Sequence, residues 1–79
     1  MQTTMKIKLF GKLVELVGMP ELNIDAVTTL DDLKETLTTC YPVLLHQTFV
    51  IAIDKKIVHD NQNISLDAEI ALMPPFSGG

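Results

Sequence analysis

The end of the sequence combines residue types that suit a carboxylate offered to another enzyme: Pro74-Pro75-Phe76-Ser77-Gly78-Gly79. Gly78 and Gly79 have no Cβ atom, so they can enter a narrow channel in an extended form that is closed to other residues. The two prolines should stiffen the base of this tail. A carboxylate needs activation, for instance as an acyl-adenylate, before sulfur or nitrogen can attack it. We therefore interpret the tail as a handle for a partner's active site, with a frayed end as the alternative.

Residues for self-contained catalysis or metal binding do not form a recognisable pattern. His46 and His59 have no nearby cysteine or ligand-spaced carboxylate, and there is no glycine-rich phosphate loop. Ser65 and Ser77 lack the context of an activated nucleophile. The single cysteine, Cys40, excludes an internal disulfide, and we interpret it as a small apolar filler near a helix end. We expect no metal, no permanently bound cofactor and no enzyme that works alone.

Length and charge narrow the class of protein further. The chain has 79 residues, 47% of them hydrophobic, which predicts one globular domain over residues 1–79 with residues 74–79 as a projecting tail. Ten acidic residues against six basic ones give a net charge of −4, without a basic cluster. We therefore expect no nucleic-acid partner, and instead attraction to basic patches on partner proteins. No apolar run is long enough for a membrane, so we expect a cytoplasmic protein.

Hydrophobic patterning predicts the strands that must hold the tail. Residues 5–10 and 21–26 alternate apolar and polar side chains, as half-buried strands do, and should pair as a hairpin. Residues 12–17 between them should form a helical turn or a wide connector. The apolar run 49–53, the pair Ile57-Val58 after a polar turn, and residues 69–73 indicate three more strands. The loop 60–67 should be anchored by Ile64 and Leu66.

One long helix is predicted between these strands. Thr29 should cap its start, where two aspartates complement the helix dipole, and the helix should run to about Cys40 before Pro42 stops it. An apolar stripe faces the core: Leu30, Leu33, Leu37 and Tyr41. The order of elements predicts an α+β architecture, with one main helix against one mixed sheet.

Strand alternation also predicts an exposed apolar patch. If Leu9 faces the core, Phe10 faces outward, and the same parity turns Ile57 and Met73 away from the helix. Should the first and last strands be neighbours, these three residues would merge into one patch beside the tail. Such a patch usually marks a protein interface, although scattered surface residues are the alternative.

Several motifs together point to a family: Lys8-Leu9-Phe10, Glu15-Leu16-Val17-Gly18, Thr29-Leu30-Asp31-Asp32-Leu33, Ala52-Ile53-Asp54-Lys55-Lys56-Ile57-Val58 and Met73-Pro74-Pro75-Phe76-Ser77-Gly78-Gly79. From Met5 onward the chain resembles the small subunits of molybdopterin synthase, which belong to the ubiquitin-like sulfur-carrier family. A strand followed by Pro-Pro-x-Ser/Thr-Gly-Gly is specific. The related thiamine-pathway carrier typically lacks the paired prolines. The resemblance implies a ubiquitin-like β-grasp fold.

The resemblance also implies a reaction cycle. An activating enzyme would adenylate Gly79 with ATP, and a sulfur donor protein would convert the adenylate into a thiocarboxylate. The tail would then insert into the large synthase subunit, which carries the catalytic groups, and deliver sulfur to cyclic pyranopterin monophosphate within a heterotetramer. Gly78 would give access, and the preceding residues would guide the tail: Pro74, Pro75, Phe76 and Ser77. Phe10, Ile57 and Met73 match positions where the family docks its partner.

Two residues depart from the family pattern, and other functions remain open. Phe76 stands where valine is common, and Asp54 stands where asparagine is frequent. One alternative is a sulfur carrier for the thiazole of thiamine. Another is a ubiquitin-like modifier that joins Gly79 to lysines of target proteins. A third is a plain interaction domain whose tail is chemically idle.

Overall fold

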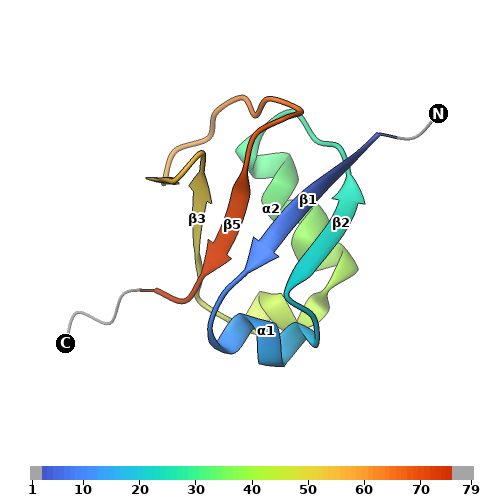
Figure 1. Ribbon diagram of the computed structural model, residues 1–79, viewed down its shortest axis with the longest axis vertical. Coiled ribbons are helices and arrows are strands. Elements are labelled where there is room, and N and C mark those ends of the chain that lie inside the picture. The colour runs from blue at the N-terminus through green and yellow to red at the C-terminus, as the bar shows by residue number, and fades with distance from the viewer. Residues whose placement is uncertain (1–2, 76–79) are drawn as a thin grey trace.

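The computed structural model describes residues 3–75, so the site residues predicted at Phe76, Ser77, Gly78 and Gly79 lie outside the described residues. Within this range two strands alternate with the helices in the first half of the chain, and the remaining strands follow one another in the second half (Figure 1). The elements are β1 (Thr4–Leu9), α1 (Lys12–Val17), β2 (Glu21–Asp25), α2 (Leu30–Cys40), the 3-10 helix η1 (Pro42–His46), β3 (Val50–Ile53), β4 (Lys56–Val58) and β5 (Ile70–Met73).

The strands form one mixed sheet in the order β2-β1-β5-β3-β4. β1 pairs antiparallel with β2, as predicted, and parallel with β5. β3 pairs antiparallel with both β5 and β4. The first and last strands are therefore neighbours, and β5, which leads to the C-terminal tail, lies in the middle of the sheet. The predicted α+β architecture is confirmed.

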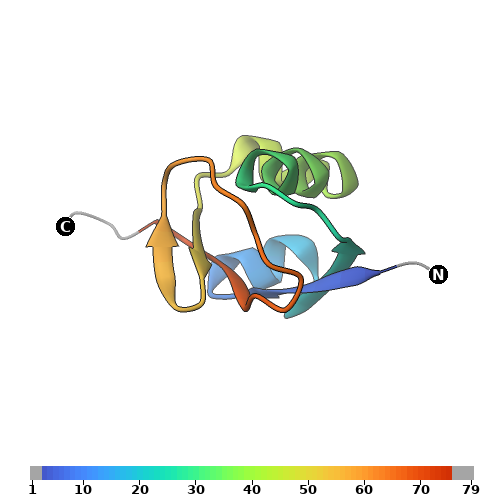
Figure 2. The same ribbon diagram turned by 90° about the horizontal axis from the view of Figure 1, so that it is seen from above.

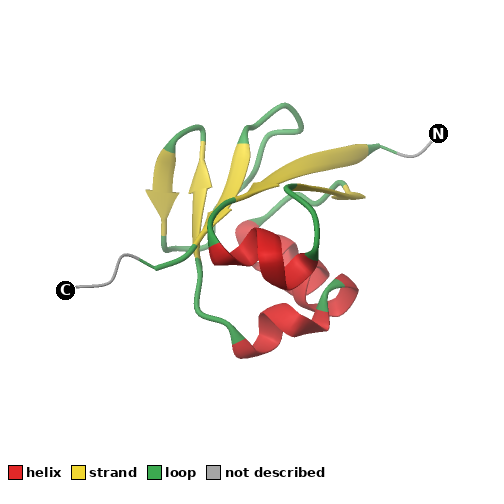
Figure 3. Ribbon diagram, turned by 60° about the horizontal axis from the view of Figure 1, so that its bottom comes forward, coloured by secondary structure: helices red, strands yellow, loops and turns green. Residues whose placement is uncertain are grey.

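The helices cover one face of this sheet, and the core lies between the two layers (Figures 2 and 3). Three leucines of α2 have no exposed surface: Leu30, Leu33 and Leu37. They belong to the same buried cluster as the inward residues of β1, which are Met5, Ile7 and Leu9. The Thr29 hydroxyl accepts a hydrogen bond from the Asp32 N–H at 3.2 Å, so the predicted cap of α2 is confirmed.

The structure at and after the end of α2 differs from the prediction in two ways. Pro42 ends α2, but the chain then forms η1, in which Leu44 donates its N–H to the Tyr41 carbonyl at 2.9 Å and is itself buried. Cys40 is exposed, so its interpretation as an apolar filler was wrong. The half-buried Tyr41 packs against the core as the next apolar side chain after Leu37, and Cys40 at the end of α2 is left facing solvent.

The loop between β4 and β5 holds only one of its two predicted anchors. Ile64 is buried, and its N–H donates to the Thr28 carbonyl at 2.7 Å. Leu66 is 62% exposed, so its prediction as an anchor was wrong. The cause is a local turn, in which the Ala68 N–H donates to the Ser65 carbonyl at 3.1 Å. Leu66 lies inside this turn and faces away from the core.

The turn between β3 and β4 explains the residue type at position 54. Asp54 and Lys55 have φ angles of 52° and 70°. Asparagine and aspartate adopt such a positive φ more readily than most residues. The Asp54 carboxylate also accepts a hydrogen bond from the Glu69 N–H at 3.0 Å, and the Asp54 N–H donates to the Glu69 carbonyl at 2.8 Å. This turn therefore fixes the start of β5 against the β3–β4 hairpin.

The positive φ of Lys55 leads to a stability prediction. Lys55→Gly should raise the free energy of unfolding by roughly 0.5 to 1 kcal/mol, because glycine has no Cβ to strain at this φ. Chemical denaturation with urea measures this change. Lys55→Ala is the matched control, since it removes the long side chain but keeps the Cβ, and it should give no gain. An equal rise of the free energy of unfolding in both variants would contradict the explanation by backbone strain at Lys55.

Candidate functional site

The three predicted docking residues lie on the sheet face opposite the helices. Phe10 is 47% exposed directly after Leu9, which is 4% exposed, so the predicted change of side at this position is confirmed. Ile57 is 38% exposed, and Met73 is half-buried. Alternation along the strands thus assigned each side chain to the correct face.

Strand pairing brings these residues together. The Phe10 N–H donates to the Leu72 carbonyl at 3.1 Å, so Phe10 continues the hydrogen bonding of β1 with β5 beyond Leu9. On the other side of β5 lies β3, where Ala52 pairs with Ala71 of β5. Ala52 also pairs with Ile57 of β4. One continuous surface therefore crosses β1, β5, β3 and β4.

This surface is concave, and we call it the docking hollow. It has a volume of about 510 Å³ and is lined by Lys8, Phe10, Ala52, Lys55, Ile57, Glu69, Ala71 and Met73. Ala52 and Ala71 pair with each other at its centre, where their small side chains leave room between the larger apolar ones. Sequence reasoning missed the alanines and the charged residues. The signal was available for Lys8, because this β1 residue has the same outward parity as Phe10, which follows the strand.

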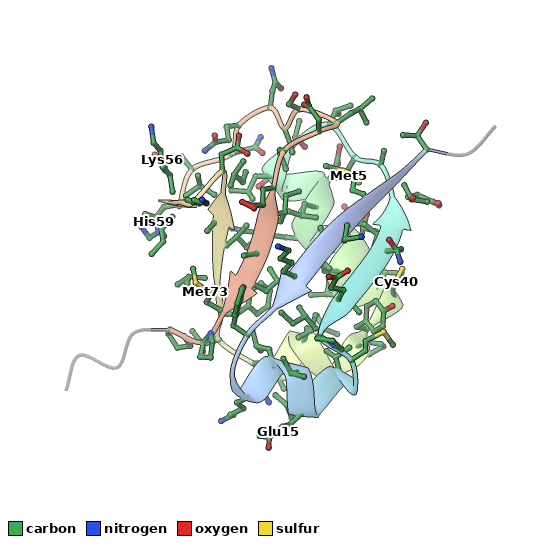
Figure 4. All side chains as sticks on the ribbon, in the orientation of Figure 1. Met5, Glu15, Cys40, Lys56, His59 and Met73 are labelled. Carbon is green, nitrogen blue, oxygen red and sulfur yellow. The ribbon has the colours of Figure 1, made fainter. Side chains whose placement is uncertain are left out.

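The base of the tail begins beside the docking hollow. Met73, which ends β5, lies next to the point where the chain leaves the sheet (Figure 4). Pro74 follows and is half-buried, whereas Pro75 is exposed. A Cβ atom placed on Gly11 would come within 2.9 Å of the Pro74 Cγ, so Pro74 packs directly on the Gly11 backbone. This contact fixes the direction in which the tail starts.

Gly11 is therefore a position where glycine is required. Its φ of 59° and ψ of −136° are strained for any residue with a Cβ. We expect Gly11→Ala to lower the free energy of unfolding by about 1 to 3 kcal/mol, measured by urea denaturation. Part of this cost should disappear in a Pro74→Ala background, because the 2.9 Å contact involves the Pro74 ring. Unchanged stability of Gly11→Ala would contradict both the strain and the contact.

Other kinds of site receive no support from the part of the chain that the structure describes. Between residues 3 and 75, no group of three or more histidine, cysteine or acidic side chains comes together as a metal site. No helix in the same range has the length and apolar character to cross a membrane. Of the predicted site features, the described residues contain the docking hollow and the base of the tail.

A mixed sheet with this strand order, one main helix on one face and a tail leaving the central strand is a ubiquitin-like β-grasp fold. The structure of the small archaeal modifier protein 1 from Haloferax volcanii matches it with a TM-score of 0.80. That match covers 96% of this chain and 99% of the other, at 24% identity. The likeness establishes the class of protein by its fold.

The family is established by sequence. The model of the ThiS family matches residues 7–79, and the chain belongs to this family. It is 29% identical to the molybdopterin synthase sulfur carrier subunit of Caenorhabditis briggsae, over 96% of this chain and 98% of the relative. It is 30% identical to the protein of the same name from Dictyostelium discoideum, over the whole of both chains. The chain is a sulfur carrier of the ThiS type.

Proposed function

We propose that this chain is the sulfur-carrier subunit of a molybdopterin synthase. Its C-terminal Gly79 is adenylated, converted to a thiocarboxylate, and donates sulfur to cyclic pyranopterin monophosphate in molybdenum cofactor biosynthesis. Full-length similarity to curated relatives of that name supports the choice of pathway. The observation that carries the mechanism is the position of β5, which ends at the docking hollow and leads directly into the tail.

The chemistry requires that the chain supply the acyl group and that its partners supply everything else. The activating enzyme uses ATP to join AMP to the Gly79 carboxylate, with loss of pyrophosphate, so that the carbonyl carbon becomes an electrophile. The terminal sulfur of a persulfide on the sulfur donor protein then attacks this carbon, and AMP leaves. A thiol reductant cleaves the bond between the two sulfur atoms, which releases the thiocarboxylate and the reduced donor. None of these steps needs a side chain of this chain at the reacting carbon.

The geometry supports separate roles for the docking hollow, which would bind the partner, and for the tail, which would enter the partner's active site. A large synthase subunit that covers Phe10, Ile57 and Met73 would bury apolar surface at the point where the tail starts. Pro74 on Gly11 gives the tail a fixed base, so less conformational entropy is lost when Pro75, Phe76, Ser77 and Gly78 thread toward the partner's active site. Docking and threading then act as linked events.

Intact mass spectrometry tests this proposal. The chain is incubated with the activating enzyme of the same organism, ATP and a sulfur donor, and we expect one oxygen to be exchanged for sulfur at Gly79. The loaded chain, mixed with the large synthase subunit and cyclic pyranopterin monophosphate, should then yield molybdopterin. Loading followed by sulfur transfer only to a thiazole precursor would favour the thiamine carrier instead. Isopeptide bonds to lysines of other proteins, without sulfur transfer to the pterin, would favour a modifier.

A further inference from the structure

The docking hollow differs in charge from the exposed face of α2. Of the six lysines, only Lys34 lies on α2, which also carries Asp31, Asp32 and Glu35. Two of the others line the docking hollow on the opposite side of the sheet, Lys8 from β1 and Lys55 from the β3–β4 turn. The net charge of −4 therefore does not describe the lining of the docking hollow.

The lysines of the docking hollow are also unpaired within the described chain. Among residues 3–75, the ion pair is Lys6 with Glu21, at 3.5 Å between Nζ and Oε2. Neither Lys8 nor Lys55 has a carboxylate of residues 3–75 within 4.0 Å. Glu69 also lines the hollow, so the lining residues carry two positive charges and one negative charge. Two unpaired ammonium groups at the edge of an apolar hollow favour a partner that brings carboxylates.

We propose that the large-subunit surface that covers the docking hollow is acidic, with an apolar side chain set against Ala52 and Ala71 and carboxylates against Lys8 and Lys55. This inference rests on the proposed function and specifies the partner's chemistry. It reverses the expectation from net charge, which favours basic patches on partners. Charge complementarity at this site would raise the rate of association and set the orientation in which the tail reaches its channel.

Charge-reversal variants at matched positions test the inference. Lys8→Glu and Lys55→Glu change the net charge by the same amount as Lys34→Glu, which lies on α2 away from the hollow. Association with the large synthase subunit of the same organism is measured by surface plasmon resonance at low and at high salt. We expect Lys8→Glu and Lys55→Glu each to slow association roughly tenfold at low salt, and Lys34→Glu to slow it less than about twofold. Glu69→Gln should accelerate association.

The contrast between positions decides the outcome. Equal effects of Lys8→Glu and Lys34→Glu, or faster association of Lys8→Glu, would overturn the acidic surface. A smaller difference between Lys8→Glu and the wild type at high salt is expected, because salt screens exposed charges. Circular dichroism of each variant confirms that the fold is unchanged. No binding of the wild-type chain would overturn the proposed function together with this inference, whereas binding without a Lys8 effect would overturn the inference alone.

Discussion

A chain extended by one residue after Gly79, or shortened by removal of Gly79, is expected to lose sulfur loading completely. The reacting carbon is the C-terminal carboxyl carbon, and either change moves it away from the position that Gly79 would place in the activating enzyme. The fold should be unaffected, because β5 ends at Met73 and the buried core lies within residues 5–72. Intact mass spectrometry after incubation with the activating enzyme, ATP and the sulfur donor measures loading, and circular dichroism measures the fold.

Substitutions within the tail test whether a side chain near Gly79 blocks loading by its size, while the terminal carboxylate itself is unchanged. Gly78→Val should also block loading, since a β-branched side chain does not fit a channel shaped for glycine. Phe76→Val is the matched control, because it introduces the same side chain at a position where related carriers commonly have valine, and it should load normally. Normal loading of a chain that retains its extra residue after Gly79 would defeat the proposed chemistry. Equal loss in both valine variants would point to general disruption of the tail.

Substitutions at the neighbouring residues Phe10 and Leu9, whose side chains face opposite sides of the sheet, should affect binding in one case and folding in the other. Phe10→Asp should weaken binding to the large synthase subunit by about 2 kcal/mol or more, because Phe10 is 47% exposed and lines the docking hollow. Leu9→Ala should lower the free energy of unfolding by about 2 to 5 kcal/mol, because Leu9 is 4% exposed in the core. Titration calorimetry measures the first effect and urea denaturation the second.

An exposed leucine away from the hollow provides the control for this comparison. Leu66 is 62% exposed in the β4–β5 loop and does not line the docking hollow, so Leu66→Asp should change neither binding nor stability by more than a few tenths of a kcal/mol. Phe10→Asp with unchanged affinity would rule out the hollow as the docking site. Unfolding of Phe10→Asp as severe as that of Leu9→Ala would mean that Phe10 serves the core instead.

The faces of the strands could be predicted from the sequence because side chains alternate with a period of two along a strand. That rule alone placed Leu9 in the core and Phe10 outside it. The start of α2 was equally predictable, since a threonine before two aspartates satisfies free N–H groups and the helix dipole within one turn. Such signals depend on neighbouring residues, and no distant part of the chain needs to be known.

The burial of residues in loops and at helix ends could not be predicted from the sequence in the same way. Leu66 is apolar like Ile64, but a turn from Ser65 to Ala68 exposes it, and Cys40 at the end of α2 faces solvent. Both errors arose because hydrophobicity reports a preference for burial, whereas the path of the backbone decides which side chain reaches the core.

What the sequence determined by itself was therefore the type of fold, the outward parity of Phe10, Ile57 and Met73, and the Gly-Gly end with its possible chemistry. Only the tertiary structure decided that the three outward residues and the base of the tail lie beside one another. The parallel pairing of β1 with β5 places the first and last strands side by side, and Pro74 after β5 packs on Gly11 after β1. The same sheet collects Lys8 and Lys55 around one hollow despite a net negative charge. Composition sums charges over the whole chain, but a partner meets only the charges that strand pairing gathers on one face.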